Sequence, residues 1–341
     1  MSYLQYYGLE QEPFSNAPVS RFYFHSKQHD QALLRLRRVT DQMKGLAVLV
    51  GDIGAGKTTL ARKMLDSLPE SDYEAALLVI IHSSISAQWL LRRIAQQLGV
   101  QKPAETKLQI LSQLYRRLLQ IADSGKKAVV LIDEAQMLQT REIMEEFRGL
   151  LNLEIPDKKL ITFIFFGLPE IEDTLKLDPP LQQRVAFKYR LDAFDSESTR
   201  RYIEHRLNLS GATRAIFDAS AIDAIHQYSR GIPRLINTLA DNALFEGFIL
   251  KSETIRTEII ENIAVDLGLS VAQKRELRVV GSDQPVTVVD EVSFGNPLAE
   301  PPLIPEVELA EEKPAEQPFE RSETPENEDI DSILAGLEEK L

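Results

Sequence analysis

A lysine and a threonine that follow a glycine-rich turn are the residues of this sequence best suited to bind phosphate. The segment Gly51–Thr58 has the spacing Gly-x4-Gly-Lys-Thr. Glycines let the backbone turn tightly and approach an anion closely, so that successive N–H groups can point at its oxygens. A lysine at this spacing can reach the β- and γ-phosphates of a nucleoside triphosphate, and the threonine hydroxyl can bind Mg²⁺. The segment therefore predicts a phosphate-binding (Walker A) loop.

The elements on both sides of this loop support that interpretation. The apolar run 46–50 predicts a buried strand, and Leu60, Met64 and Leu68 recur at the spacing of a helix. A phosphate loop sits between a strand and a helix, and the helix N-terminus adds positive potential. A glycine-rich turn with an incidental lysine is the alternative, which this context disfavours. The expected nucleotide-binding residues are Gly51, Asp52, Ile53, Gly54, Ala55, Gly56, Lys57, Thr58 and Thr59.

Two adjacent carboxylates, Asp133 and Glu134, follow another apolar run at 128–132. An aspartate at the end of a strand can orient the water shell of Mg²⁺, and the next glutamate can polarise the attacking water. Alone the pattern is weak, but it lies 76 residues after Lys57, with a strand and two helical patterns between. We therefore predict Thr58 and Asp133 for the metal and Glu134 for catalysis; a solvated acidic strand end is the alternative.

Strands alternate with helices up to residue 191, and only helical patterns follow. Apolar runs predict strands at 75–81, 160–166 and 187–191, and Trp89 is expected in the core. This order predicts an α/β fold with a parallel sheet sandwiched by helices, followed by a small all-α domain. The expected domains are an N-terminal aromatic strap and first helix (1–45), a nucleotide-binding α/β domain (46–193), a helical lid domain (194–269), a disordered linker (270–327) and an amphipathic helix (328–341).

The first 30 residues are rich in aromatic side chains and turn signals. One interpretation is a strap that packs over the core. The other is a cover for the nucleotide base, because an aromatic segment that precedes the phosphate-loop strand can lie near the base. Both interpretations stay open at this point.

The formal net charge of −13 belongs to the C-terminal segment. Residues 281–341 hold 17 acidic and 3 basic side chains, and residues 1–280 hold 35 and 36. The segment also contains eight of the 17 prolines, and this composition indicates disorder. The nearly neutral body neither promotes nor forbids binding to nucleic acid.

The last fourteen residues break the composition of that segment. Their apolar residues share one face of a helix, with acidic residues at its N-terminal end. We expect a recognition helix that folds into an apolar groove of a partner. Docking onto the protein's own body and a chance pattern are the alternatives. The residues of the stripe are Ile330, Ile333, Leu334, Leu337 and Leu341.

Several classes of protein are disfavoured by composition. The chain has no cysteine, so disulfides and thiolate metal sites are excluded, which suits a reducing cytosol. No apolar run approaches the roughly 18 residues that a membrane span needs. The first residues lack the charged and apolar regions of a signal peptide.

Taken together, these segments resemble the AAA+ ATPases of the ExeA/GspA type, the A components of general secretion and type IV pilus (MSHA-like) assembly systems. The resemblance covers roughly residues 1–269, and it extends to transposition regulators of the TniB type and to origin-recognition ATPases. The motifs that carry it are Tyr7-Gly8-Leu9, Pro13-Phe14-Ser15, Gly51–Thr58, Ile132-Asp133-Glu134-Ala135-Gln136, Leu151-Asn152-Leu153-Glu154, Gly167-Leu168-Pro169-Glu170, Gln183-Arg184-Val185 and Gly231-Ile232-Pro233-Arg234.

The resemblance implies ATP hydrolysis with ATP and Mg²⁺ as ligands, in a nucleotide-dependent homo-oligomer. Arg184 is then the arginine finger offered to a neighbouring subunit's γ-phosphate, and Arg234 is sensor 2; a surface ion pair and a cap-region arginine are the alternatives. Family members commonly carry a polar residue, often Gln, where this chain has Leu168. A leucine side chain cannot form a hydrogen bond there, so slow hydrolysis is expected.

The function expected from these features is that of a cytosolic assembly factor or switch for a bacterial secretion or pilus envelope machine. Longer secretion members continue into a membrane span and a periplasmic domain, which are absent here. We therefore expect a cytoplasmic protein that reaches the inner membrane through a partner. An ATP-dependent DNA-binding regulator of transposition or partition and a weakly hydrolysing scaffold are the alternatives.

Overall fold

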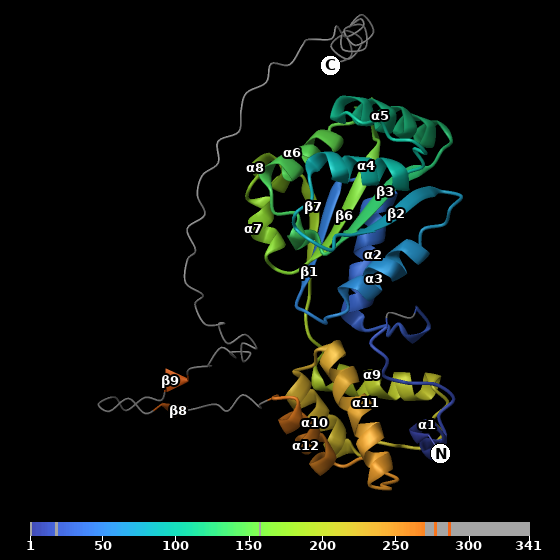
Figure 1. The fold of residues 1–341 in the computed structure, drawn as a ribbon, viewed down its shortest axis with the longest axis vertical. Coiled ribbons are helices and arrows are strands. Elements are labelled where there is room, and N and C mark those ends of the chain that lie inside the picture. Colours follow the sequence, from blue (N-terminus) through green and yellow to red (C-terminus); the bar gives the residue numbers. More distant parts are fainter. Residues whose placement is uncertain (1, 18–19, 157, 270–275, 278–285, 288–341) are drawn as a thin grey trace, which may run out of the picture. The chain divides into compact units, whose positions relative to one another are not determined.

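Five parallel strands form the sheet that carries the phosphate loop (Figure 1). Their order across the sheet is β2-β3-β6-β1-β7, so β1, which leads into the loop, lies between β6 and β7. Every residue of β1 is buried, which explains its continuous apolar run. The strands are β1 (Leu46–Gly51), β2 (Tyr73–Val79), β3 (Lys127–Asp133), β6 (Ile161–Gly167) and β7 (Val185–Leu191). The predicted α/β class with a parallel sheet is confirmed.

In this computed structural model the described residues are 2–17, 20–156, 158–269, 276–277 and 286–287. Contacts divide the chain into two units, 1–275 and 276–341. Within the second unit the structure describes one antiparallel pair, β8 (Glu276–Leu277) with β9 (Val286–Thr287). The rest of the predicted linker beyond residue 269 and the predicted C-terminal helix lie outside the described residues.

Helices cover both faces of the sheet. Side chains alternate along β1, so Val48 packs into one apolar cluster and Leu49 into another. The Val48 cluster contains the buried faces of α4, α5 and α6, and the Leu49 cluster contains those of α2 and α3. The bounds of these helices are α2 (Lys27–Asp41), α3 (Lys57–Asp66), α4 (Ala87–Gln97), α5 (Lys107–Asp123) and α6 (Arg141–Leu150).

Short elements connect the main ones, and sequence analysis did not predict them. They are the 3-10 turns η1 (Ser20–Phe22) and η2 (Ala135–Met137), the hairpin of β4 (Glu154–Ile155) and β5 (Lys158–Lys159), and the helices α7 (Ile171–Leu175) and α8 (Pro179–Gln182). Their brevity explains the omission, because two to five residues do not establish a periodic pattern.

After β7 the described chain up to residue 269 contains only helices with their own apolar core. They are α9 (Ser196–Leu209), α10 (Ala219–Ser229), α11 (Pro233–Ile249) and α12 (Thr257–Asp266). Asp195 and Asp218 cap α9 and α10 through their side chains, and Pro233 occupies the first turn of α11, where proline fits.

The N-terminal segment packs on these helices. It contains a short helix that was not predicted, α1 (Tyr3–Tyr7), which begins with a capping box at Ser2. The Tyr7 hydroxyl donates to the Ser252 carbonyl at 3.0 Å, and the ring of Phe14 meets that of Phe217 edge-on at 6.1 Å. The N-terminal segment therefore packs on the helices that follow β7, before the chain crosses to the sheet.

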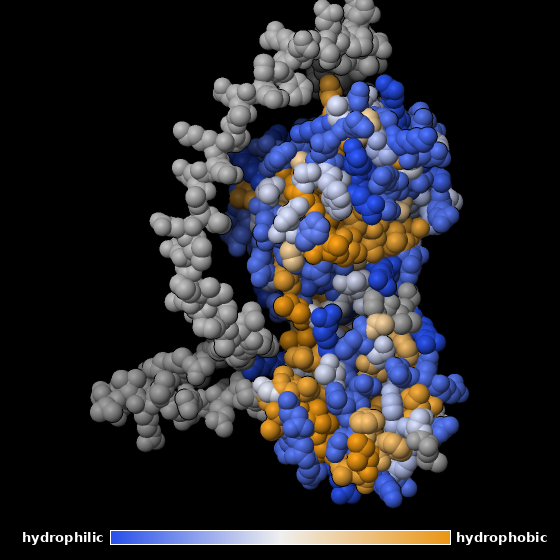
Figure 2. Space-filling view, in the orientation of Figure 1, coloured by the Kyte–Doolittle hydropathy of each residue, from blue (hydrophilic) through white to orange (hydrophobic). Residues whose placement is uncertain are grey.

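One core prediction is wrong. Trp89 on α4 is 40% exposed, and the Arg93 guanidinium lies over its ring at 5.9 Å. The apolar face of this helix is instead filled by smaller residues such as Leu90, Leu91 and Ile94. Figure 2 shows apolar surface near the edge strand β2, where Val79 is also among the exposed large apolar side chains. Among the described residues, no helix is long and apolar enough to cross a membrane.

Candidate nucleotide-binding site

The glycine-rich loop lies between β1 and α3, as its motif requires. Gly54 and Gly56 have φ values of +79° and +99°, which L side chains rarely adopt. Gly56 occupies the N-cap of α3 without a side-chain cap, so an anion can take the place of a capping oxygen. The predicted loop thus has the backbone shape of a phosphate site.

The lysine of the loop is buried and turned toward its own backbone. Lys57 Nζ donates to the carbonyls of Gly51 at 2.8 Å and Asp52 at 3.0 Å. Burial lowers the pKa of Lys57, while Glu134 and Asp133 act in the opposite direction. A phosphate would offer this ammonium stronger acceptors than two carbonyls do.

The end of β3 provides an acceptor suited to a cation. Asp133 is 1% exposed, and its Oδ1 accepts from the Glu134 N–H at 3.0 Å. Its Oδ2 is buried and has no hydrogen-bond partner. Burial raises the pKa of Asp133, against the lowering effect of the neighbouring Thr58 hydroxyl. A buried carboxylate oxygen without a donor fits a Mg²⁺ shell, with Thr58 beside it.

The described residues contain no cluster of three or more histidine, cysteine or acidic side chains that could hold a metal by itself. Mg²⁺ characteristically binds through one or two protein groups together with substrate phosphates and water. The pair Thr58 and Asp133 therefore agrees with a metal that arrives with a nucleotide.

Glu134 and the end of β6 are joined through a single side chain. The Gln136 amide nitrogen donates to Glu134 Oε2 at 2.6 Å, and its Oε1 accepts from the Leu168 backbone N–H at 3.0 Å. Glu134 has φ +56°, the left-handed region, and it lines the same cavity as Lys57. The catalytic candidate is thus near the phosphate loop and linked to residue 168.

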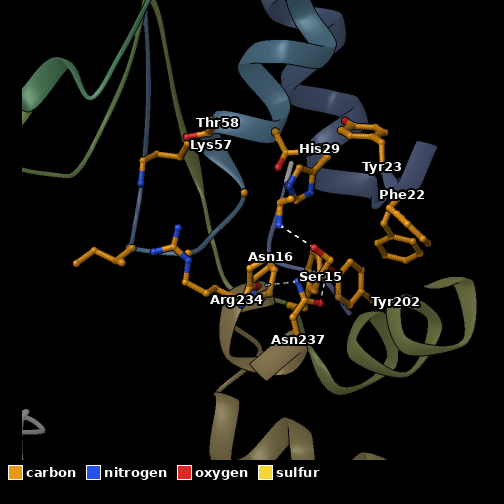
Figure 3. A pocket seen from close by; sticks show the side chains of 18 of the residues that line it. Ser15, Asn16, Phe22, Tyr23, His29, Lys57, Thr58, Tyr202, Arg234 and Asn237 are labelled. Atoms are coloured by element: carbon orange, nitrogen blue, oxygen red, sulfur yellow. Dashed lines mark hydrogen bonds between the residues drawn. The ribbon is translucent and has the colours of Figure 1, made fainter. Parts of the chain in front are cut away.

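A cavity of about 520 Å³ connects the phosphate loop to the N-terminal segment and the C-terminal helices. Figure 3 shows Lys57 and Thr58 in one part of it and Asn16, Tyr202 and Asn237 in another. From the first 30 residues, which were expected either to pack over the core or to cover the base, the cavity is lined by Ser15, Asn16, Ala17, Phe22, Tyr23, Phe24 and His29. Residues that sequence analysis did not assign to a site, and that also line it, are Gln136, Met137, Phe194, Tyr202, Arg206, Pro233 and Asn237.

A chain of hydrogen bonds organises the part of the cavity away from the phosphate loop. Arg206 donates to the Tyr202 hydroxyl at 2.8 Å, which donates to Asn237 Oδ1 at 2.9 Å. Asn237 in turn donates to Asn16 Oδ1 at 3.1 Å. Arg206 is 4% exposed, its other amino group donates to the Ser15 carbonyl at 3.1 Å, and its Nε has no hydrogen-bond partner. Fixed amides beside aromatic rings can hold a nucleobase.

His29 on α2 lies against the phosphate loop. Its Nδ1 is 2.7 Å from the Ser26 hydroxyl, and its Nε2 lies 3.1 Å from the place that a Cβ on Gly56 would take. Burial lowers the pKa of His29 to about 4, although Asp30 and a hydrogen bond to the Ala55 backbone act against this. At neutral pH an uncharged imidazole therefore packs against the loop and lines the cavity.

The two predicted arginines occupy different places. Arg234, at the start of α11, lines the cavity, and its backbone N–H donates to the Gly54 carbonyl at 3.3 Å. A Cβ on Gly54 would lie 2.8 Å from the Arg234 Cβ, so the loop needs glycine here. Arg184 does not line the cavity, and its guanidinium donates to the Asn152 side-chain oxygen.

The residues that sequence analysis missed give almost no local signal. Asn16 and Asn237 are 221 positions apart and carry no motif. Arg206 is an exception, because it follows Tyr202 by four residues and so falls on the apolar face of α9. A charged residue on such a face is expected to have a specific partner, which is a signal that the sequence contained.

Comparisons with known proteins agree with this geometry. A family model described as an AAA domain matches residues 40–175. General secretion pathway protein A of Aeromonas hydrophila is 34% identical over 256 residues, which cover 74% of this chain and 46% of that protein. The chain therefore spans about half the length of this curated relative.

Solved structures share the fold at low sequence identity. The ORC2 protein of Aeropyrum pernix in its ADPNP–ADP complexes gives a TM-score of 0.58 with 17% identity, over 75% of this chain and 71% of that one. The ORC1 protein of Aeropyrum pernix in complex with DNA gives 0.54 with 14% identity, over 75% and 68%. The family match spans the phosphate loop and both predicted carboxylates. It also includes four of the five strands of the sheet, β1, β2, β3 and β6. This chain belongs to the AAA+ ATPases of the type of General secretion pathway protein A.

Proposed function

We propose that the protein binds ATP with Mg²⁺ and hydrolyses it as a nucleotide-dependent switch. The observation that carries this proposal is the unpartnered buried oxygen of Asp133, beside Thr58 and one residue before the Glu134 carboxylate that lines the cavity. A metal-nucleotide complex would satisfy that oxygen and would give Lys57 a phosphate acceptor. A turn with only a structural role would not need a lysine, a threonine hydroxyl and two carboxylates at one place.

Each group has a distinct task in the proposed reaction. The backbone N–H groups of 51–59 and Lys57 hold the phosphates, and Thr58 and Asp133 hold Mg²⁺, which supplies charge neutralisation when it is bound. Glu134 orients the attacking water and accepts its proton. The aromatic and amide side chains at the other part of the cavity surround the base.

Arg184 acts on a neighbouring subunit in this proposal. Its guanidinium donates to Asn152 and does not line the cavity of its own chain, which agrees with a role at another chain's γ-phosphate. A cation supplied across an interface makes hydrolysis depend on assembly. Arg234 lies in the first turn of α11 beside Gly54, and we propose that it transmits the nucleotide state to helices α9 to α12.

The similarity to General secretion pathway protein A suggests the kind of partner, which we propose is a component of an envelope machine. The proposed role is a cytoplasmic assembly factor for a secretion or pilus envelope machine, peripheral to the inner membrane through that partner, with 328–341 as its recognition segment. A DNA-bound regulator is the second candidate, because the fold is shared with an ORC1 protein that was solved in complex with DNA. ATP-dependent binding to duplex DNA would separate the two.

The test is a pair of variants measured alone and mixed. Glu134→Gln keeps the shape but cannot accept the proton, so ATP binding should persist while hydrolysis falls by at least a hundredfold. Arg184→Ala should also be inactive alone. In a mixture that co-assembles, an Arg184→Ala subunit keeps its Glu134 and can receive Arg184 from a neighbouring Glu134→Gln subunit. Turnover should therefore partly return. Full activity of Glu134→Gln would refute the catalytic assignment, and a co-assembled mixture without rescue would refute the finger.

A further inference from the structure

Gln136 uses both ends of its amide to join two parts of the catalytic region. Its nitrogen donates to Glu134 Oε2 at 2.6 Å, and its oxygen accepts from the Leu168 N–H at 3.0 Å. The residue is 5% exposed. A buried amide with both ends engaged has one orientation, because a flipped amide would place like groups against each other.

The neighbouring backbone is shaped around this amide. A Cβ on Gly167, the last residue of β6, would lie 3.0 Å from Gln136 Oε1 and 3.3 Å from its backbone nitrogen. Gly167 therefore leaves the space in which the amide reaches residue 168. Glu134 itself has the left-handed φ of +56°, which few L residues adopt without a local reason.

We propose that Gln136 is a positioning residue that ties the Glu134 carboxylate to the backbone of residue 168. It occupies one carboxylate oxygen and leaves the other for the attacking water. A γ-phosphate that displaces the end of β6 then moves the catalytic carboxylate with it. The inference rests on the proposed ATP hydrolysis.

This arrangement gives a role to residue 168 that does not need a polar side chain. The contact uses the backbone N–H of Leu168, and every residue except proline has that donor. The leucine that departs from the family pattern is therefore compatible with a link between β6 and Glu134. The slow hydrolysis expected from this leucine does not follow if the link runs through the backbone.

The first test is Gln136→Ala in the full-length protein. It frees Glu134 while leaving the phosphate loop and metal residues in place. We expect kcat to fall by roughly ten- to a hundredfold, with the ATP dissociation constant within about twofold of wild type. Gln139→Ala is the matched control, because Gln139 is exposed and three residues further along. Unchanged kcat in Gln136→Ala would overturn the inference.

The second test reads a property that a purely structural residue would not change. Gln136→Glu is nearly isosteric, but it places a second carboxyl within hydrogen-bond distance of Glu134. Two such carboxyls share a proton below a raised pKa and repel each other above it. The kcat of this variant should therefore rise as the pH falls from about 8.5 to 6, whereas the wild-type value should not. A pH profile parallel to that of Gln139→Glu would overturn the inference.

A third variant narrows the space around the oxygen end of the Gln136 amide. Gly167→Ala adds one methyl group against Gln136 Oε1 and should lower kcat less than Gln136→Ala does, with ATP binding retained. If Gln136→Ala fails to fold, as judged by its melting curve, this variant and the pH profile decide the matter. Wild-type protein without Glu134-dependent hydrolysis overturns the proposed function and this inference together; normal wild-type hydrolysis with normal Gln136 variants overturns the inference alone.

Discussion

The two ends of the nucleotide cavity are built in different ways. The phosphate end comes from the turn after β1 and from the end of β3. The groups proposed to bind phosphate and metal and to activate water lie within Gly51–Thr59 and Asp133–Glu134. The base end takes Asn16 from the N-terminal segment, Tyr202 and Arg206 from α9, and Asn237 from α11. Continuous backbone forms the first end, and tertiary packing forms the second.

The difference follows from what each end must do. A triphosphate has a fixed array of charges, which successive backbone N–H groups and one lysine can match within a single turn. A base presents edges and faces, which need side chains from several directions. The phosphate end is therefore visible in the sequence as a motif, and the base end becomes visible only when distant segments are folded together.

The largest effect is expected from Lys57→Ala. Lys57 is the only lysine or arginine in the loop 51–59, so this change removes the cationic side chain of the loop. ATP affinity should fall by at least about a hundredfold, since the charge-assisted contacts to the β- and γ-phosphates disappear. Inorganic tripolyphosphate should lose affinity to a similar extent. Both dissociation constants can be measured by calorimetry or by competition with a labelled nucleotide.

The control for this change is Lys176→Ala, an exposed lysine beyond the site. Its ATP affinity should equal that of the wild type. An unaltered ATP affinity in Lys57→Ala would show that the phosphates bind elsewhere. The motif would then not form the phosphate end of the cavity.

How much the sequence revealed follows the same division. The sheet strands and longer helices were predicted because their apolar residues form runs or repeat with the period of a strand or a helix. β2 starts two residues before its predicted position, at Tyr73, because its first residues are less apolar than the rest of the run. Trp89 was misplaced because residue type alone does not show which helix face is covered. The N-terminal segment was one of two open possibilities for covering the base, but the contact between Asn16 and Asn237 was missed because these residues meet only after folding.

An intermediate effect is expected at His29, which lies where the two ends meet. Its ring touches the phosphate loop at Gly56 and lies 5.7 Å from the ring of Phe194, which lines the cavity. The pKa is about 4 in the folded chain against about 6.5 when unfolded, so the unfolded chain binds more protons in this range. Stability should therefore decline as the pH falls below about 6.5, and His29 should account for about 2 kcal/mol between pH 7 and 5.

His29→Gln tests this contribution. The variant cannot gain the proton, so its free energy of unfolding should change less between pH 7 and 5 than that of the wild type. His82→Gln, at an exposed histidine, should keep the wild-type pH dependence. Denaturant titrations at several pH values give the comparison. Equal slopes for the wild type and His29→Gln would mean that folding does not change the pKa of His29.

The smallest effect is expected at the base end, from Arg206→Met. Methionine fills a similar volume but leaves the Tyr202 hydroxyl and the Ser15 carbonyl without their donor. The hydrogen-bond chain to Asn237 and Asn16 then loses its fixed direction. We expect ATP affinity to fall by about five- to tenfold and the preference for ATP over GTP to shrink, because a contact of this kind contributes roughly 1 kcal/mol.

The matched control for this last change is Arg201→Met, at an exposed arginine on the same helix. Tripolyphosphate distinguishes the two ends, since it has no base and should bind Arg206→Met as well as it binds the wild type. Equal losses of ATP and tripolyphosphate affinity would mean that Arg206 supports the whole cavity rather than its base end. Unchanged ATP affinity, with an unchanged preference over GTP, would place the base outside this cluster. A loss of affinity for nucleotides without a loss of affinity for tripolyphosphate would show that the two ends act separately. The motif then binds the phosphates, and the tertiary contacts select the base.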